Sequence, residues 1–162
     1  MTGMMLALVL ATAAPAAPQA MQTDKADELK AKALELMTER RHWDEAAELW
    51  VRSAREREAA DPERDAALGQ AAVLFYYLGE FDESLELFGR AAAGALERGA
   101  IAMAAKYYLD GAQVAAHGGN RDVGESLIER ARLLAGSPHL TAPERAAIEA
   151  RLPDAPATIA SR

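Results

Sequence analysis

With 162 residues, the chain suits one compact domain, and its lack of cysteine excludes disulfides, thiolate metal sites and a cysteine nucleophile. Its net charge of −7 is concentrated in residues 61–100, where 8 acidic side chains outweigh 3 basic ones, a balance of −5. Nucleic acids and anionic membrane surfaces are bound through basic patches, and the sequence has none, which argues against both as partners.

The composition favours helices. Apolar residues make up 51% of the chain and aromatic residues only 6%, which is typical of helices packed closely through small side chains. No run of four or more residues alternates between apolar and polar as a half-buried strand would. The sequence therefore predicts an all-α fold.

Residues 1–20 contain no charged side chain and include an apolar run from Met4 to Ala14. This run is shorter than the roughly 20 residues that span a bilayer. Small residues follow at the spacing that a signal peptidase accepts, so we expect a signal peptide and leader over 1–20, no stable membrane insertion after cleavage, and a periplasmic or secreted protein. No Lys or Arg precedes the run, so an uncleaved anchor and a cytoplasmic leader stay open as alternatives.

Two helices are expected next, over Asp24–Glu39 and from Trp43 to about Glu58, separated by Arg41-His42. Their inner faces are given by apolar residues at helical spacing: Leu29, Ala33, Leu36 and Met37 in the first, and Trp43, Ala46, Ala47, Trp50 and Ala54 in the second. Asp61-Pro62 then predicts a new helix start, with an acidic N-cap followed by proline.

The stretch 65–98 contains the clearest helical hairpin. Apolar residues recur every three or four positions on both sides of Gly79, where a left-handed helix ending suits glycine. Further helices are expected over 100–117, 121–135 and from a Thr141–Glu144 capping box to Leu152. Prolines at 153 and 156 predict a disordered tail over 153–162.

The hairpins repeat. Trp43 aligns with Phe81, and Trp50 with Phe88, at an offset of 38 residues, and a further shift of 40 brings Ile128 onto Phe88. A lone hairpin leaves one apolar flank exposed, so we expect the hairpins to stack, with Trp50, Phe88 and Ile128 filling the space between neighbours.

This pattern resembles the tetratricopeptide repeat family over residues 26–152. The matching residues are Leu34, Met37, Trp43, Ala46 and Trp50, then Leu68, Ala72, Phe75, Gly79, Phe81, Ser84, Phe88 and Ala91, then Tyr108, Ala112, Gly119, Gly124, Ile128 and Ala131. The resemblance implies a right-handed α-solenoid over 21–152, with three hairpins and a C-terminal capping helix. The 38–40-residue spacing exceeds the family's 34, which indicates degenerate repeats.

The resemblance also implies a non-catalytic scaffold that docks a peptide or a partner helix in a groove. The groove positions that it implies are Gln70, Val73, Tyr76, Tyr77, Lys106, Leu109, Asp110 and Gln113, preceded by Glu28, Ala31, Lys32 and Glu35 in the first helix. At 100° per residue, at least one of Tyr76 and Tyr77 must turn away from the packing face that Phe75 occupies. The alternative is that both tyrosines cover the fifth helix internally.

No catalytic, cofactor or metal site is expected. His42, His117 and His139 each lie at a predicted break between helices, and none has a neighbour at metal-ligand spacing. Two other functions stay open: a homo-oligomer that assembles through the terminal helical flanks, and an enzyme whose site has no recognisable pattern.

Overall fold

The computed structural model describes residues 17–153, and all regular structure within this range is helical. A 3₁₀ turn at Arg40–His42 precedes the second helix. The α-helices are α1 (Ala17–Leu36), α2 (Trp43–Arg55), α3 (Pro62–Leu78), α4 (Phe81–Glu97), α5 (Ile101–His117), α6 (Arg121–Ala135) and α7 (Ala142–Glu149).

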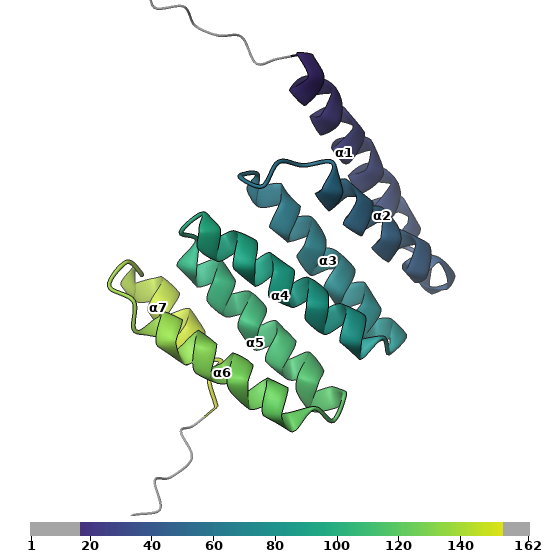
Figure 1. The fold of residues 1–162 in the computed structure, drawn as a ribbon. Coiled ribbons are helices and arrows are strands. Elements are labelled where there is room, and N and C mark those ends of the chain that lie inside the picture. Colours follow the sequence, from purple (N-terminus) through teal and green to yellow (C-terminus); the bar gives the residue numbers. More distant parts are fainter. Residues whose placement is uncertain (1–16, 154–162) are drawn as a thin grey trace, which may run out of the picture.

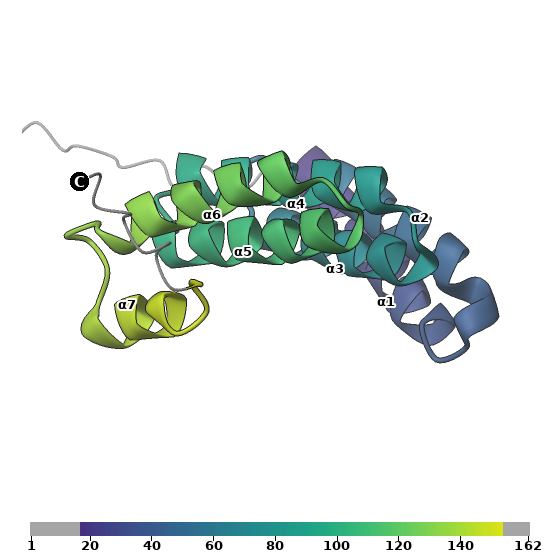
Figure 2. The ribbon, with the colours of Figure 1, turned by 90° about the horizontal axis from the view of Figure 1, so that it is seen from below.

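The helices form an open row in which each one packs against the next along the chain (Figure 1). Seen from below, α1, α3 and α5 lie in one layer and α2, α4 and α6 in another (Figure 2). The last helix, α7, packs against both α5 and α6. Because α1 and α6 lie at opposite ends of the row, the molecule is not a closed bundle (Figure 1).

Glycines end three successive helices by the same device. Gly79, Gly99 and Gly119 follow α3, α4 and α5 and have φ angles of 87°, 73° and 76°. The residue after each donates its N–H back to the helix, as Glu80 does to the Phe75 carbonyl at 2.9 Å. Only glycine adopts this left-handed conformation at little cost, so the expectation at Gly79 is confirmed.

Several predicted helix ends are wrong. Helix α1 runs over Ala17–Leu36 instead of starting at Asp24 and reaching Glu39, and α2 and α7 end at Arg55 and Glu149. The Trp43 indole N–H donates to the Met37 carbonyl at 3.0 Å. This bond satisfies a backbone carbonyl at the end of α1, so that the chain turns before the predicted end at Glu39. Leu34, one of the residues that match the tetratricopeptide pattern, is 51% exposed.

The predicted leader and tail lie largely outside the described part. Residues 1–16 and 154–162 are not described, so the expected signal peptide and tail are not tested there. Within residues 17–153, no helix combines the length and the apolar character that crossing a membrane requires.

Buried small residues let neighbouring helices approach closely. Ala46, Ser84 and Gly124, which match the repeat pattern, are all buried. The Ser84 hydroxyl donates to the Ala72 carbonyl at 2.7 Å across α3 and α4, and Ser53 donates to the Ala26 carbonyl at 2.8 Å across α1 and α2. These bonds satisfy the hydroxyls inside an otherwise apolar core.

The bulky residues of the repeat differ in burial. Trp50 and Phe88 are each 4% exposed, and the Phe88 ring lies 6.4 Å from that of Tyr107 on α5. Phe88 therefore packs between α4 and the following helix, as predicted. Ile128, at the equivalent place in α6, is only half-buried, because α7 has 8 residues and covers less of this flank than a 17-residue helix would.

A buried ion pair joins the start of α3 to the end of α4. Asp65 is 2% exposed, and its Oδ2 lies 2.5 Å from Arg98 Nη1, an ion-pair contact without hydrogen-bond alignment. The Asp65 carboxylate occupies a notch left by Gly94, where a Cβ atom would lie 2.8 Å from Asp65 Cγ. Neither feature was expected from the sequence.

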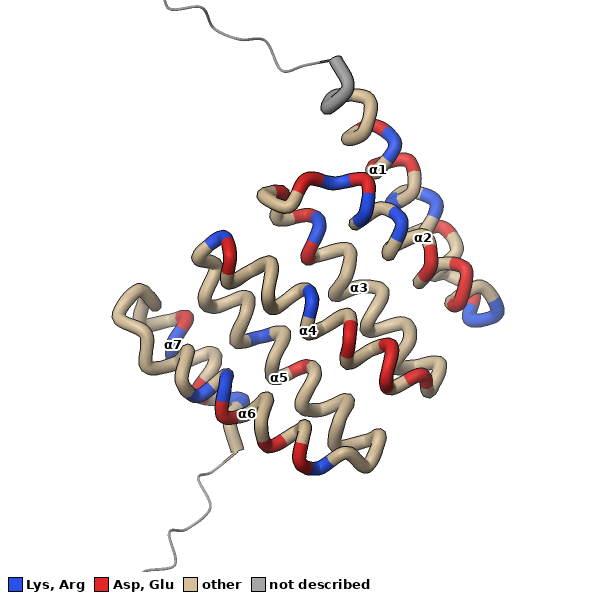
Figure 3. The backbone as a smooth tube through the Cα atoms, viewed as in Figure 1, with Lys and Arg blue, Asp and Glu red and all other residues tan. Residues whose placement is uncertain are grey.

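Acidic side chains recur at helix starts. Helices α2, α4 and α6 begin with acidic residues in their first turns, at Asp44, Glu45, Asp82, Glu83 and Asp122 (Figure 3). Carboxylates there interact favourably with the helix dipole. Their position is thus explained by helix stability, without a chemical role.

Replacing Thr141 by alanine is expected to destabilise α7. Thr141 and Glu144 form the predicted capping box, in which each side chain satisfies a backbone N–H of the other. Losing it should cost about 1 kcal/mol of unfolding free energy. Hydrogen exchange at the α7 amides would measure this, with Thr141→Ser as the matched control. Equal hydrogen exchange in Thr141→Ala and Thr141→Ser would contradict the expectation that the capping box stabilises α7.

Acid should weaken the junction of α2 and α3 through Asp61. Burial alone would raise the pKa of Asp61, but hydrogen bonds from Arg57 and the Glu63 N–H outweigh it and hold the pKa below the usual 3.8. A carboxylate of this kind stabilises the fold above its unfolded pKa, and that contribution is lost as the pH falls through the folded pKa.

We therefore expect Asp61→Asn to be less stable than the natural chain near neutral pH. The difference should shrink once the pH falls below about 3.8, the ordinary pKa of the group. Urea unfolding of both proteins at about pH 7 and about pH 3 measures this. A difference that stays constant across that interval would contradict it.

Candidate functional site

The last two turns of α3 present three apolar or aromatic side chains toward α5. Phe75 and Tyr76 are partly buried against the core, whereas Tyr77, about 200° from Phe75 around the helix, turns away from it, and Val73 lies one turn before Tyr77. Val73 and Tyr77 are 37% and 57% exposed. The end of α3 therefore offers an apolar surface beside α5.

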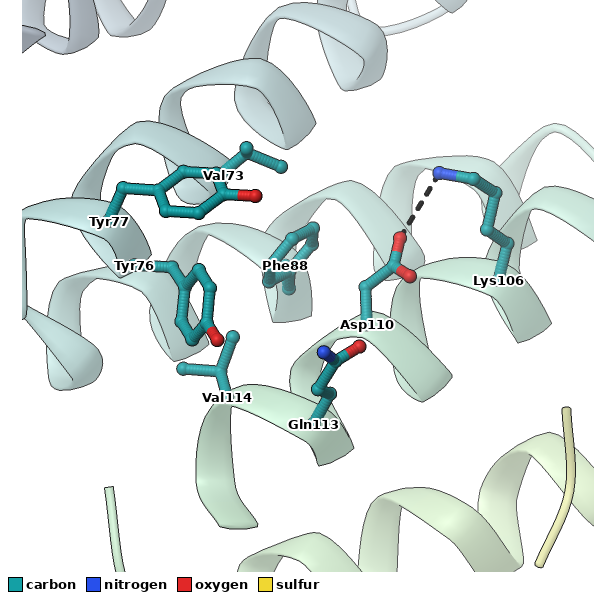
Figure 4. Close-up of a pocket in the computed structure, with 8 residues that line it drawn as sticks. All are labelled: Val73, Tyr76, Tyr77, Phe88, Lys106, Asp110, Gln113 and Val114. Atoms are coloured by element: carbon teal, nitrogen blue, oxygen red, sulfur yellow. Dashed lines mark hydrogen bonds and ion pairs between the residues drawn. The ribbon is translucent and has the colours of Figure 1, made fainter. Parts of the chain in front are cut away.

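This surface borders a hollow of about 300 Å³ between α3 and α5, which we call the central hollow (Figure 4). Its lining comes from three helices: Val73, Tyr76 and Tyr77 on α3, Phe88 on α4, and Lys106, Asp110, Gln113 and Val114 on α5. Six of these eight side chains are groove positions named from the sequence. Phe88 and Val114, which were not named as groove positions, complete the lining.

Tyr76 and Tyr77 have different environments. The Tyr76 hydroxyl lies 2.6 Å from His117 Nδ1, and the two rings stack at 5.5 Å, so Tyr76 covers the end of α5. The Tyr77 ring lies 5.1 Å from Tyr76 and 5.8 Å from Trp43 on α2, and more than half of it is exposed. Tyr76 thus serves partly to cover α5, whereas Tyr77 is available to a ligand.

The opposite side of the central hollow is polar, and its charged groups are held in ion pairs. Lys106 Nζ lies 3.1 Å from Asp110 Oδ2, and Arg151 Nη2 lies 2.6 Å from Asp110 Oδ1. Beneath Lys106, burial raises the pKa of Tyr107 to about 12, with the Asp65 carboxylate adding to the effect. Tyr107 therefore stays uncharged, and the two charged side chains that line the hollow, Lys106 and Asp110, are paired with each other.

The other predicted groove positions lie outside the central hollow. Leu109 is 6% exposed and borders a separate space beside Ile128 and Pro153, while Gln70 is exposed but does not line the hollow. The predicted positions on α1 are also exposed and do not line it: Glu28, Ala31, Lys32 and Glu35. The site is therefore shorter than a groove running along all three helices.

No cluster of three or more His, Asp or Glu side chains within residues 17–153 could hold a metal ion. His42 ends the 3₁₀ turn, His117 ends α5, and His139 lies in the loop before α7. Each histidine thus lies at a break between helices, as the sequence predicted.

Comparison with known proteins gives no match, either to a protein-family model or to a curated protein. The tetratricopeptide resemblance therefore rests on the repeated residues of the sequence.

Proposed function

We propose that this protein is a non-catalytic scaffold that binds a peptide or a helix of a partner protein in the central hollow. In this proposal the row of helices is a right-handed solenoid of three tetratricopeptide-like hairpins, with α7 as the capping helix. The protein works outside the cytoplasm, a placement that rests on residues 1–20 alone.

The observation that carries the proposal is the exposed Tyr77 ring at the edge of the central hollow. Large aromatic side chains with an apolar body and a polar tip are the residues that most often dominate binding energy at protein interfaces. Tyr77 adjoins Val73 and Tyr76 around a space of about 300 Å³, which suits one or two side chains of a ligand. The neutralised Lys106–Asp110 pair limits the charge that such a ligand can carry.

A photo-crosslinking amino acid at position 77 tests the proposal in the producing cell. The matched control carries it at Leu133, which is 77% exposed on α6 and outside the hollow. We expect a discrete crosslinked partner from position 77 only, and Tyr77→Ala should weaken binding of that partner at least about tenfold. Equal crosslinking from both positions, or none from position 77, would remove the hollow from the proposal.

The proposed compartment has its own test. Fractionation of cells followed by sequencing of the mature N-terminus should give a chain that begins between about Ala14 and Ala17, found outside the cytoplasm. An intact Met1 in the cytoplasmic fraction would overturn this part and leave the binding role standing.

One observation favours self-assembly as a second function. Leu133, on α6, is the most exposed large apolar side chain in the described residues. At the other end of the row, α1 exposes Met21 and Leu34, by 72% and 51%, among polar residues such as Glu28 and Lys32. Sedimentation at micromolar concentration separates the two functions, because the scaffold is expected to be a monomer when alone.

A further inference from the structure

A second hollow lies directly beside the central one. It measures about 370 Å³, is called here the edge hollow, and is lined by Tyr76, Tyr77, Leu78, Gly79, Phe81 and His117. Tyr76 and Tyr77 border both hollows, so their rings separate two adjacent spaces. The Tyr76 ring also lies 6.1 Å from Phe81. The surface is therefore a short row of two spaces bordered by aromatic rings.

The length of this row argues against a helical ligand. A helix with its side chains is about 10 Å across and needs a continuous apolar strip over several turns. Here the strip ends on one side at the Lys106–Asp110 pair and does not extend onto α1, where Glu35 and Lys32 are exposed. Two small spaces suit single side chains of an extended segment better.

Two other recurring modes of peptide recognition require features that the two hollows do not have. Adding a strand to a sheet requires an exposed strand edge, and residues 17–153 contain no strand. Binding of acidic or phosphorylated peptides requires free cations, whereas Lys106, the one lysine or arginine that lines either hollow, is paired with Asp110. Once helical, strand-adding and acidic peptides are excluded, an uncharged peptide in an extended conformation remains as the ligand.

We propose that the two hollows bind a proline-containing segment in the polyproline II conformation, an inference that rests on the proposed function. Residues three apart in this conformation lie on the same side, about 9 Å from one another, so two prolines can occupy adjacent spaces. Aromatic-lined grooves suit such segments, which are already extended before they bind and lose little entropy.

Two side chains at the central hollow can donate the hydrogen bonds that this ligand would need. The carbonyl groups of a polyproline II segment have no internal partners and accept hydrogen bonds from outside. The Tyr77 hydroxyl and the Gln113 amide both point toward the central hollow (Figure 4). They can donate to ligand carbonyls while the rings of Tyr76, Tyr77 and Phe81 contact the prolines.

The experiment titrates the full chain with three synthetic peptides of about ten residues and follows backbone amide signals by NMR. One peptide has proline at every third position, one has alanine at those positions, and one is an uncharged amphipathic helix. We expect the proline peptide to shift the signals of Val73, Tyr77 and Gly79, and to bind at least about tenfold more tightly than the alanine peptide. Tyr77→Ala should reduce this binding about tenfold, and Leu133→Ala should leave it unchanged.

The outcomes separate this inference from the function on which it rests. Equal binding of the proline and alanine peptides, or shifts that avoid both hollows, would overturn the proline preference. Binding of the helical peptide alone, lost in Tyr77→Ala, would overturn it as well and would leave the scaffold proposal intact. If no peptide binds, the proline preference fails, and crosslinking from position 77 decides the scaffold proposal on its own.

Discussion

Replacing Gly94 by alanine is expected to lower the free energy of unfolding by about 3–5 kcal/mol, the usual cost of breaking a buried ion pair. The new Cβ atom would lie 2.8 Å from Asp65 Cγ and closer still to Oδ1, so the carboxylate would have to leave its notch. Moving it separates Asp65 from Arg98, and with Asp65 only 2% exposed, water cannot replace the lost partner. Urea unfolding followed by circular dichroism measures the change.

The same helix provides the control. An added Cβ at Gly89 would meet nothing within 4 Å, so Gly89→Ala is expected to be neutral or to stabilise α4 by up to about 1 kcal/mol. In an Asp65→Ala background, Gly94→Ala should cost far less, because the colliding carboxylate is gone. An equal cost of Gly94→Ala in both backgrounds would show that the collision is not the cause.

Replacing Phe88 by alanine is expected to cost about 3–5 kcal/mol and to disrupt the central hollow. Phe88 is 4% exposed, packs against Tyr107 and lies within the hollow between α3 and α5. Its removal leaves a cavity between α4 and α5 and takes away the apolar base that Val73 and Val114 share. Thermal and urea unfolding would report the loss of stability, and peptide titration the loss of the site.

Two comparisons separate packing from binding at this position. Phe88→Leu keeps most of the buried volume and should cost less than Phe88→Ala. Leu133→Ala, at a side chain that is 77% exposed, should change stability by no more than about 0.5 kcal/mol. If Phe88→Ala were as mild as Leu133→Ala, Phe88 would not be a packing residue between adjacent hairpins.

The parts of the fold that depend on neighbours along the chain were predictable. Gly79, Asp61-Pro62 and the Thr141–Glu144 box each control a helix end through groups within a few residues, and the structure has all three. The end of α1 was mispredicted because it depends on the Trp43 side chain reaching back to Met37. Helix ends fixed by side chains that reach back from the following helix leave little signal in local periodicity.

Contacts between distant residues were harder to foresee. Ala72 was listed among the residues that match the repeat pattern, yet the close approach to α5 occurs at Gly69, where an added Cβ would lie 2.8 Å from the Tyr107 ring. The Gly94 notch likewise exists only because α3 places Asp65 beside α4. A single sequence shows the small residue but not the partner that requires it.

The candidate site was predictable in its position and less so in its extent. Six of the groove positions that the tetratricopeptide resemblance implied, on α3 and α5, line the central hollow. The sequence could not show that Leu109 is buried by the last hairpin or that Tyr76 is held by His117. The burial of Leu109 and the Tyr76–His117 contact depend on how α6, α7 and the end of α5 pack against their neighbours.

Because each helix packs chiefly against its neighbours in the chain, the molecule should come apart gradually from its ends. Contacts close in sequence form early in folding, so collapse of this row should be fast for its length. The middle helices, α3 to α5, have neighbours on both sides and should open last. The central hollow, between α3 and α5, should thus keep its shape while α1 frays. Removing residues from the N-terminal end of the row should leave the hollow intact.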